Sequence, residues 1–371
     1  SHEHDGPAAP TMSPQDHAAH AATMSPHDAM GHGGHAGMSM AARGEPALSR
    51  AEDDLESMPR CYPACLPTMR RFSIPPDTDM LKEEFDTLVP ATGDFNRRSF
   101  VRSAVGTGFA AAVLPVMAQT VIKTDSAGLV AGEVTIPVGG FKMPAYRAAP
   151  AGRTGLPVVL VISEIFGVHE HIADVARRFA KAGYLAIAPE LFVRQGDAGS
   201  YGEIGKLIAE VVSKVPDAQV MGDLDACLAW AKAEGADTSK TGVTGFCWGG
   251  RITWLYSAHN PAVKAGVAWY GRLVGDSTAL MPKNPIDLVG QLNGPVLGLY
   301  GEKDTGIPQD TIEKMKTALA NGSPAARKSQ FVVYPDAPHA FNADYRPSYR
   351  KAAAEDGWKR CIDWFKANGV A

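Results

Sequence analysis

Residues 241–256 read TGVTGFCWGGRITWLY, in which a β-prone run leads through glycines into apolar residues at helical spacing. The pattern predicts a strand, a tight turn and a helix in direct succession. In the central G-x-C-x-G motif, the two glycines permit a strained turn that carries the middle side chain up and out of the chain. Cys247 is therefore the candidate nucleophile.

Two features of this predicted turn favour reactivity of the thiol. A cysteine at a helix N-terminus lies at the positive end of the helix dipole, which favours the thiolate. The backbone N–H of Trp248, the next residue, points toward the place where an oxyanion would develop during acyl transfer. The alternative interpretation of the motif is a buried cysteine beside a glycine-rich packing turn.

Strand and helix patterns alternate from about residue 129 to the C-terminus. An opening antiparallel pair of strands is expected at 131–137 and 143–147, and further strands at 157–162, 184–188, 241–244, 265–270, 295–300 and 330–334. Helices are expected near 170–182, 202–214 and 217–234, directly after Cys247, and near 308–320 and 348–367. This alternation predicts an α/β fold with a mostly parallel sheet and helices on both faces. Residues 119–371 are predicted to form this one catalytic domain.

The carboxyl ends of parallel strands carry the functional loops of such sheets, and two further candidates occur there. Asp304 follows the strand at 295–300, and His339 follows the strand at 330–334. The order nucleophile, acid, histidine is that of α/β-hydrolases. An imidazole can stabilise the Cys247 thiolate, and the acid fixes which ring nitrogen carries the proton. Glu302 and Asp336 are the rival acids.

Glu164 directly follows the apolar strand at 157–162, within the motif SEIFGV at 163–168. A carboxylate at the end of a buried strand needs a partner or an elevated pKa. Desolvation is expected to raise the pKa of Glu164 toward neutrality and make it a competent base. The N–H of Ile165 lies where α/β-hydrolases place their second oxyanion-hole donor. Alternatively, Glu164 only accepts hydrogen bonds from loop N–H groups.

Together the motifs SEIFGV at 163–168, GFCWGG at 245–250, WYG at 269–271 and PHAF at 338–341, with Asp304, resemble the dienelactone hydrolase (carboxymethylenebutenolidase) family. The resemblance covers about residues 129–367. It implies a triad of Cys247, His339 and Asp304. It also implies that Glu164 holds the resting thiol and takes its proton when substrate displaces the carboxylate.

The resemblance further implies residues that bind the substrate. Tyr270 matches a tyrosine of the family's substrate pocket. In the founding enzymes two arginines bind the carboxylate of dienelactone, and Arg346 lies near the expected place of one of them. Arg194 and Arg272 are candidates for the second by proximity, with a surface role as the alternative for either.

Residues 1 to about 90 differ from the remainder in composition. Seven of the eleven histidines and eight of the thirteen methionines lie before residue 81, and TMSPQD at 11–16 recurs as TMSPHD at 23–28. Such a segment buries too little apolar surface to offset its ordering entropy and is expected to be disordered. Its His and Met side chains could bind copper or a similar metal. A low-complexity extension, or upstream sequence that is not normally translated, is the alternative.

Residues 91–118 have the features of an export signal. Adjacent arginines at 97 and 98 are followed by Ser-Phe-Val, a short apolar core and the small-residue site Val116-Met117-Ala118. This order resembles a twin-arginine signal, with cleavage before Gln119. The protein is thus expected to use the twin-arginine export machinery and to be periplasmic or secreted. The apolar core is too short for a stable membrane anchor, and an internal amphipathic helix is the alternative.

Charge and cysteine content exclude other classes. A net charge of −4 without a long basic run argues against nucleic acid as a partner. Five cysteines in 371 residues do not form a disulfide framework, and Cys227 and Cys361 are interpreted as core thiols. The sequence thus predicts an exported hydrolase that needs no cofactor or metal and cleaves a lactone or small ester through an acyl-enzyme on Cys247. The alternatives are a general carboxylesterase or thioesterase, or a metal-binding protein that acts through residues 1–90.

Overall fold

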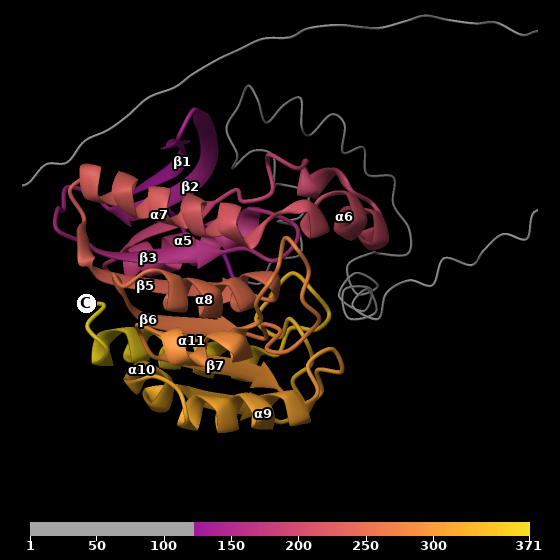
Figure 1. Cartoon of the computed structure of the whole chain (residues 1–371). Helices are drawn as coiled ribbons and strands as arrows, with labels where there is room; N and C mark the ends of the chain where they lie inside the picture. Colours follow the sequence, from indigo (N-terminus) through magenta and orange to yellow (C-terminus); the bar gives the residue numbers. More distant parts are fainter. Residues whose placement is uncertain (1–121) are drawn as a thin grey trace, which may run out of the picture. The chain divides into compact units, whose positions relative to one another are not determined.

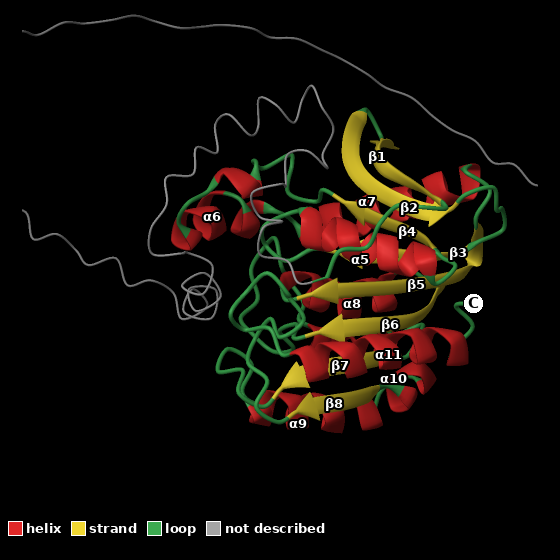
Figure 2. Ribbon diagram, turned by 180° about the vertical axis from the view of Figure 1, so that it is seen from behind, coloured by secondary structure: helices red, strands yellow, loops and turns green. Residues whose placement is uncertain are grey.

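The structure, a computed structural model, describes residues 122–371. The expectations for the His/Met-rich residues 1–90 and for the signal at 91–118 therefore lie outside the described residues. The described chain forms an eight-stranded sheet in the order β1-β2-β4-β3-β5-β6-β7-β8. The β1–β2 and β2–β4 pairs are antiparallel, and the remaining pairs are parallel. Figures 1 and 2 show this sheet from its two faces.

The strands are β1 (Leu129–Val138), β2 (Phe141–Pro150), β3 (Pro157–Ile162), β4 (Leu185–Pro189), β5 (Asp237–Phe246), β6 (Val263–Trp269), β7 (Val296–Gly301) and β8 (Gln330–Tyr334). The α-helices are α5 (Glu170–Lys181), α6 (Ile204–Glu210), α7 (Asp217–Ala233), α8 (Trp248–His259), α9 (Gln309–Ala320), α10 (Pro324–Lys328) and α11 (Lys351–Ala367). Short 3-10 helices lie at η1 (Ala198–Ser200), η2 (Val212–Lys214) and η3 (Pro285–Gln291).

Two hydrophobic clusters, one on each face of the sheet, form the core. Successive side chains of β3 alternate between them: Val159 and Val161 pack with α5 and α11, whereas Val158 and Leu160 pack with α7 and part of α8. All four are fully buried. A strand covered on both faces reads as a continuous apolar run, which explains the sequence of β3. The predicted α/β sheet with helices on both faces is confirmed.

The helix expected at 202–214 differs from the prediction. The α-helix α6 ends at Glu210, and Val211, with φ −122° and ψ −68°, leads into the 3-10 turn η2. The sequence pattern of apolar residues continues through this break, because a 3-10 turn keeps a similar side-chain spacing. The short helices α10 and η3 were not expected. Each begins with a proline, which the sequence pattern treats as a turn signal.

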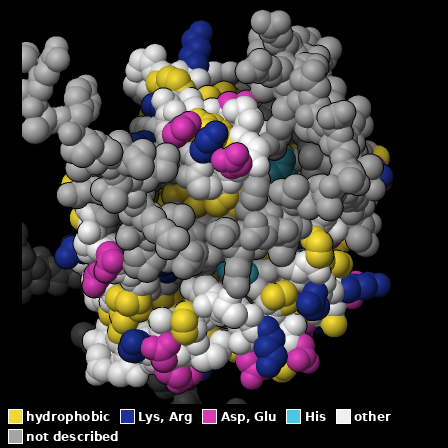
Figure 3. Space-filling model, turned by 90° about the vertical axis from the view of Figure 1, so that its right-hand side faces the viewer, with side chains coloured by type: hydrophobic (Ala, Val, Ile, Leu, Met, Phe, Trp, Pro, Cys, Tyr) yellow, Lys and Arg dark blue, Asp and Glu magenta, His cyan; other side chains and the backbone are white. Residues whose placement is uncertain are grey.

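The loops that follow the parallel strands gather at one edge of the sheet, on the right-hand side of Figure 1. Figure 3 faces this side and shows histidine at the surface, with basic and acidic side chains intermingled below it. Within residues 122–371, no helix has the length and apolar character needed to cross a bilayer.

Candidate active site

Cys247 occupies a strained turn between β5 and α8. Its backbone has φ 55° and ψ −114°, and it is the N-cap residue of α8. Its N–H donates a hydrogen bond to the carbonyl of Trp269 at 3.0 Å, so the turn is tied to the end of β6. A side chain other than glycine in this conformation costs about 1–3 kcal/mol and persists only where the surroundings impose it. The strand, strained turn and helix expected from the sequence are confirmed.

The glycines around Cys247 are required by close backbone contacts. A Cβ at Gly245 would lie 2.1 Å from the carbonyl oxygen of Gly249. A Cβ at Gly249 would lie 2.3 Å from the carbonyl oxygen of Ile162 and 2.6 Å from that of Ser163. These distances are shorter than any real Cβ contact, so only glycine fits. The first turn of α8 therefore packs against the end of β3, next to Glu164.

His339 and Asp304 form a hydrogen-bonded pair in the loops after β8 and β7. His339 Nδ1 lies 2.7 Å from Asp304 Oδ2, and Asp304 Oδ1 accepts the N–H groups of Gly306 at 3.0 Å and Ile307 at 3.2 Å. Asp304 is buried, and these bonds hold it as an acceptor. The proton is thereby assigned to Nδ1 of His339, which leaves Nε2 as the basic nitrogen.

The other residues considered near His339 have distinct surroundings. Glu302 Oε2 lies 3.7 Å from the ammonium of Lys303, and both side chains are about half exposed. Asp336 is exposed, in a turn with φ 59°. The ring of Tyr270 meets the His339 ring edge to face, with 5.1 Å between centroids. The structure thus brings the proposed pocket tyrosine against the candidate catalytic histidine.

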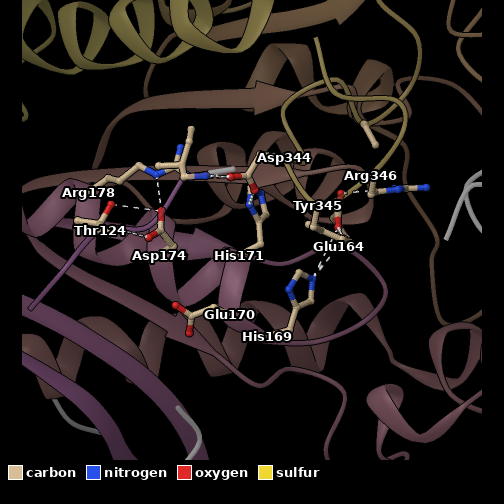
Figure 4. Close-up of polar contacts among 12 residues, drawn as sticks. Thr124, Glu164, His169, Glu170, His171, Asp174, Arg178, Asp344, Tyr345 and Arg346 are labelled. Carbon is tan, nitrogen blue, oxygen red and sulfur yellow. Dashed lines mark hydrogen bonds and ion pairs between the residues drawn. The ribbon is translucent and has the colours of Figure 1, made fainter. Parts of the chain in front are cut away.

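Glu164 is fully buried and is surrounded by three polar side chains (Figure 4). The Tyr345 hydroxyl donates to Oε2 at 2.5 Å, His169 Nε2 lies 3.9 Å from Oε2, and Arg346 Nη1 lies 3.8 Å from Oε1. Burial by itself raises the pKa of Glu164, but His169 and the Arg346 guanidinium outweigh it and lower the pKa to about 2. The expectation of a raised pKa is therefore wrong, because His169 from the same loop and Arg346 from a loop distant in sequence stabilise the ionised carboxylate.

The three candidate arginines occupy different places. Arg346 is buried and lies beside Glu164. Arg194 makes a bidentate pair with Asp223 at 2.7 and 2.8 Å and stacks over the Phe141 ring at 4.2 Å. The Arg272 guanidinium packs close to the backbone of Gly275. Of these three arginines, Arg346 is the one that lies beside the Glu164 carboxylate.

The two expected oxyanion-hole donors follow directly from these elements. Trp248 is the first residue of α8, so its N–H is one of the helix donors that have no acceptor within the helix. Ile165 is fully buried in the turn after β3. Because Gly249 packs on the end of β3, the two N–H groups belong to segments in direct contact.

Three polar residues in the loops after β3, β4 and β8 were not among the candidates from the sequence. His169 is the N-cap residue of α5, and burial lowers its pKa. Tyr345 directly precedes Arg346, and this position beside a candidate substrate-binding residue was the one feature of the sequence that pointed to Tyr345. Glu190 follows β4 and accepts the N–H of Val168 at 2.8 Å. Burial raises the pKa of Glu190 to about 7. Only the folded loops show that Tyr345 and His169 meet Glu164 and that Glu190 meets Val168.

The remaining thiols of the described chain differ from Cys247 in position. Cys227 in α7 and Cys361 in α11 are fully buried core residues, and burial raises the pKa of each. Their expected role as core thiols fits this placement. In the part of the chain from 122 onward, no group of three or more His, Cys, Asp or Glu side chains is arranged to hold a metal ion.

A mostly parallel sheet with a strained cysteine-bearing turn after β5, an acid after β7 and a histidine after β8 has the arrangement of an α/β-hydrolase. Comparison with known proteins gives the family. The sequence model described as the dienelactone hydrolase family matches residues 143–369, and the chain belongs to this family. It is accordingly a hydrolase that acts on ester bonds.

The matches with curated relatives and with a solved structure extend over almost the whole length of those proteins. A Methylorubrum extorquens protein named "Putative carboxymethylenebutenolidase" is 62% identical over 277 residues, which are 74% of this chain and 94% of the relative. The Escherichia coli K12 protein of the same name is 54% identical over 263 residues, covering 71% and 96%. A crystal structure from Klebsiella pneumoniae, described as "Putative Dienelactone Hydrolase", is 57% identical with a TM-score of 0.62 and covers 64% of this chain and 98% of that one.

Proposed function

We propose that this hydrolase cleaves a lactone or small ester through an acyl-enzyme on Cys247. The observation that carries the proposal is the arrangement at one sheet edge of Cys247 on its strained turn, the His339–Asp304 pair, and Glu164 at the end of the neighbouring strand β3. Each component of nucleophilic acyl transfer is thereby supplied by a separate element of the fold.

The first half of the reaction forms the acyl-enzyme. The Cys247 thiol gives its proton to Glu164, and the thiolate attacks the substrate carbonyl carbon. The N–H groups of Ile165 and Trp248 stabilise the resulting oxyanion. When the oxyanion collapses, the C–O bond breaks, and the leaving alkoxide takes the proton from Glu164. In a lactone this alkoxide stays attached to the acyl group.

The second half releases the acid. His339 takes a proton from water at Nε2, and the hydroxide attacks the thioester carbon. The C–S bond breaks, the Cys247 thiolate leaves, and it recovers a proton from His339. Asp304 stabilises the imidazolium that forms between these steps. The net change is hydrolysis of one ester bond by one water molecule.

The contact between Arg346 and Glu164 favours a substrate that carries its own carboxylate. Such a substrate would pair with Arg346, and the loss of that charge would raise the pKa of Glu164 and make it a better base. A screen of lactones and esters with and without a free carboxylate tests this preference. Equal turnover of both sets would favour the general carboxylesterase or thioesterase instead.

The nucleophile is tested by Cys247→Ala, which should abolish hydrolysis. Iodoacetamide should label Cys247 ahead of Cys227 and Cys361, whose thiols are held neutral in the core. Cys227→Ala is the matched control, because it removes a buried thiol from α7 rather than from the turn. Full activity of Cys247→Ala would refute the proposed mechanism.

We also propose that the protein is exported by the twin-arginine route and acts in the periplasm or outside the cell. The proposal rests on Arg97-Arg98 and the apolar segment that follows. N-terminal sequencing and the mass of the native protein test it, with a start at Gln119 expected. A mature protein that retains residues 1–90 would contradict this route and would favour a metal-binding role for that segment.

A further inference from the structure

Three consecutive residues after His339 link Glu164 to the rest of the domain. Tyr345 and Arg346 approach the two oxygens of the Glu164 carboxylate, at 2.5 Å from Oε2 and 3.8 Å from Oε1. Asp344, the residue before them, turns to the opposite side and contacts α5 (Figure 4). The loop after His339 therefore contacts the Glu164 carboxylate and is itself attached to α5.

The Tyr345 side chain is fixed by its ring as well as by its hydroxyl. The ring lies edge to face against His169, with 5.0 Å between centroids, and tilted against His171 at 5.3 Å. Its hydroxyl lies 3.4 Å from His169 Nε2, besides the short bond to Glu164. Two histidine rings from the start of α5 thus determine where the phenol of Tyr345 can reach.

Asp344 is the anchor of this loop. Its Oδ1 lies 2.9 Å from His171 Nδ1, and its Oδ2 accepts the backbone N–H of Ile122 at 2.7 Å. Arg178 Nη2 lies 4.0 Å from the same oxygen. Asp344 and His171 are both almost fully buried. A buried, multiply bonded carboxylate of this kind is costly to disturb, so the loop has one defined position.

The segment before β1 is docked on the same helix. The N–H of Thr124 donates to Asp174 at 2.5 Å, and Arg177 Nε donates to the carbonyl of Thr124 at 2.7 Å. With the bond from Ile122 to Asp344, this segment connects α5 to the loop after His339. The contacts that fix Tyr345 therefore extend from the first described residues to the end of β3.

We propose that Tyr345 is a positioning residue that holds the Glu164 carboxylate in its resting place, and that Asp344 fixes Tyr345 by tying its loop to α5 and to the segment before β1. The proposal rests on the proposed function, in which Glu164 receives the proton of Cys247. While the phenol donates to Glu164, the carboxylate is a weak base. The thiol therefore keeps its proton until a substrate rearranges the site.

The test is Tyr345→Phe, which removes the hydroxyl and keeps the ring between the two histidines. The groups that face Glu164 are Tyr345 and Arg346 from the loop, His169 at the N-cap of α5 and His171 in its first turn. Loss of a hydrogen bond to a charged group should shift the protonation equilibrium of Glu164 by about tenfold. Iodoacetamide should then alkylate substrate-free Cys247 up to about tenfold faster at pH 7. The acidic limb of the kcat/KM profile should move to higher pH.

Tyr256→Phe is the matched control. The Tyr256 hydroxyl donates to Asp225 at 3.0 Å between α8 and α7, so this variant also removes a phenol–carboxylate bond. It should leave both the alkylation rate and the pH profile unchanged. Asp344→Asn should change both in the same direction as Tyr345→Phe, and the double variant should add little. If Asp344→Asn does not fold, Tyr345→Phe alone decides.

Two results would overturn the proposal. One is a Tyr345→Phe protein with the wild-type alkylation rate and pH profile. The other is a Tyr345→Phe protein whose kcat falls while alkylation and pH profile stay the same, since that would indicate a merely structural contact. Both differ from failure of the proposed function, which is recognised by activity in Cys247→Ala.

Discussion

Replacing Glu164 by glutamine removes a negative charge from a fully buried position and keeps the shape of the side chain. His169 and Arg346 lower the pKa of Glu164 by stabilising the ionised carboxylate, to which Tyr345 also donates, whereas the amide is neutral. A pKa lowered from 4.5 to about 2 corresponds to about 3 kcal/mol, at about 1.4 kcal/mol for each pKa unit. Glu164→Gln is therefore expected to lower the free energy of unfolding at pH 7 by up to about 3 kcal/mol.

The pH dependence of this loss identifies its cause. Because the pKa of Glu164 is lower in the folded state, its stabilisation is complete above the unfolded value of 4.5 and is lost as the pH falls toward 2. Urea denaturation of wild type and Glu164→Gln should give a constant difference from pH 8 to about 5. The difference should shrink below that. A difference that stays the same down to pH 3 would refute the reasoning.

The same variant tests the base. Removal of a general base lowers kcat by about a hundredfold or more. Stopped-flow absorbance near the ultraviolet edge should show a substrate-triggered rise of thiolate in wild type and none in Glu164→Gln. An unchanged kcat with an unchanged thiolate signal would make Glu164 a structural residue, and the chemistry would then depend on His339 alone.

Three further outcomes are expected. Gly249→Ala places a Cβ 2.3 Å from the carbonyl oxygen of Ile162 and should destabilise the protein by about 1–3 kcal/mol or more in thermal unfolding. Gly222→Ala adds a Cβ in open space on α7 and should not destabilise the protein. Glu190→Gln should flatten the fall in the free energy of unfolding between about pH 4.5 and 8 by at most about 3 kcal/mol. Burial raises the pKa of Glu190 to about 7, so the stabilisation by its protonated carboxyl group is lost as the pH rises through that value. An unchanged dependence of stability on pH in urea denaturation would contradict this. Replacing Arg97 and Arg98 by lysine should keep the full-length protein in the cytoplasm by cell fractionation, and export of that variant would count against the signal.

The strands and long helices were predictable because their patterns are local. The apolar run of β3 and the glycines around Cys247 each dictate a structure within a few residues. The order of Cys247, Asp304 and His339 could also be interpreted, because parallel strands end at one edge. These inferences need only the chain order and the sheet.

The surroundings of Glu164 were not predictable in this way. Its pKa is lowered by His169, which lies close to it in sequence but only meets it after a turn, and by Arg346, which lies about 180 residues away and reaches it through a loop whose path no local pattern fixes. The sequence indicated that the carboxylate is buried, but it did not indicate which groups offset the effect of burial on the pKa. The sign of the pKa shift was therefore predicted wrongly, although the position of Glu164 was correct.

The positive φ of Cys247 lowers the stability of the folded protein at the position of the proposed nucleophile. Since only glycine adopts φ 55° at no cost, Cys247→Gly should relieve about 1 kcal/mol or more of conformational energy while removing the thiol. Under the proposed mechanism, the inactive Cys247→Gly protein would then be more heat-stable than the active one. Directed evolution that selects for heat resistance alone would tend to erode this turn, whereas selection for hydrolysis would preserve the strain.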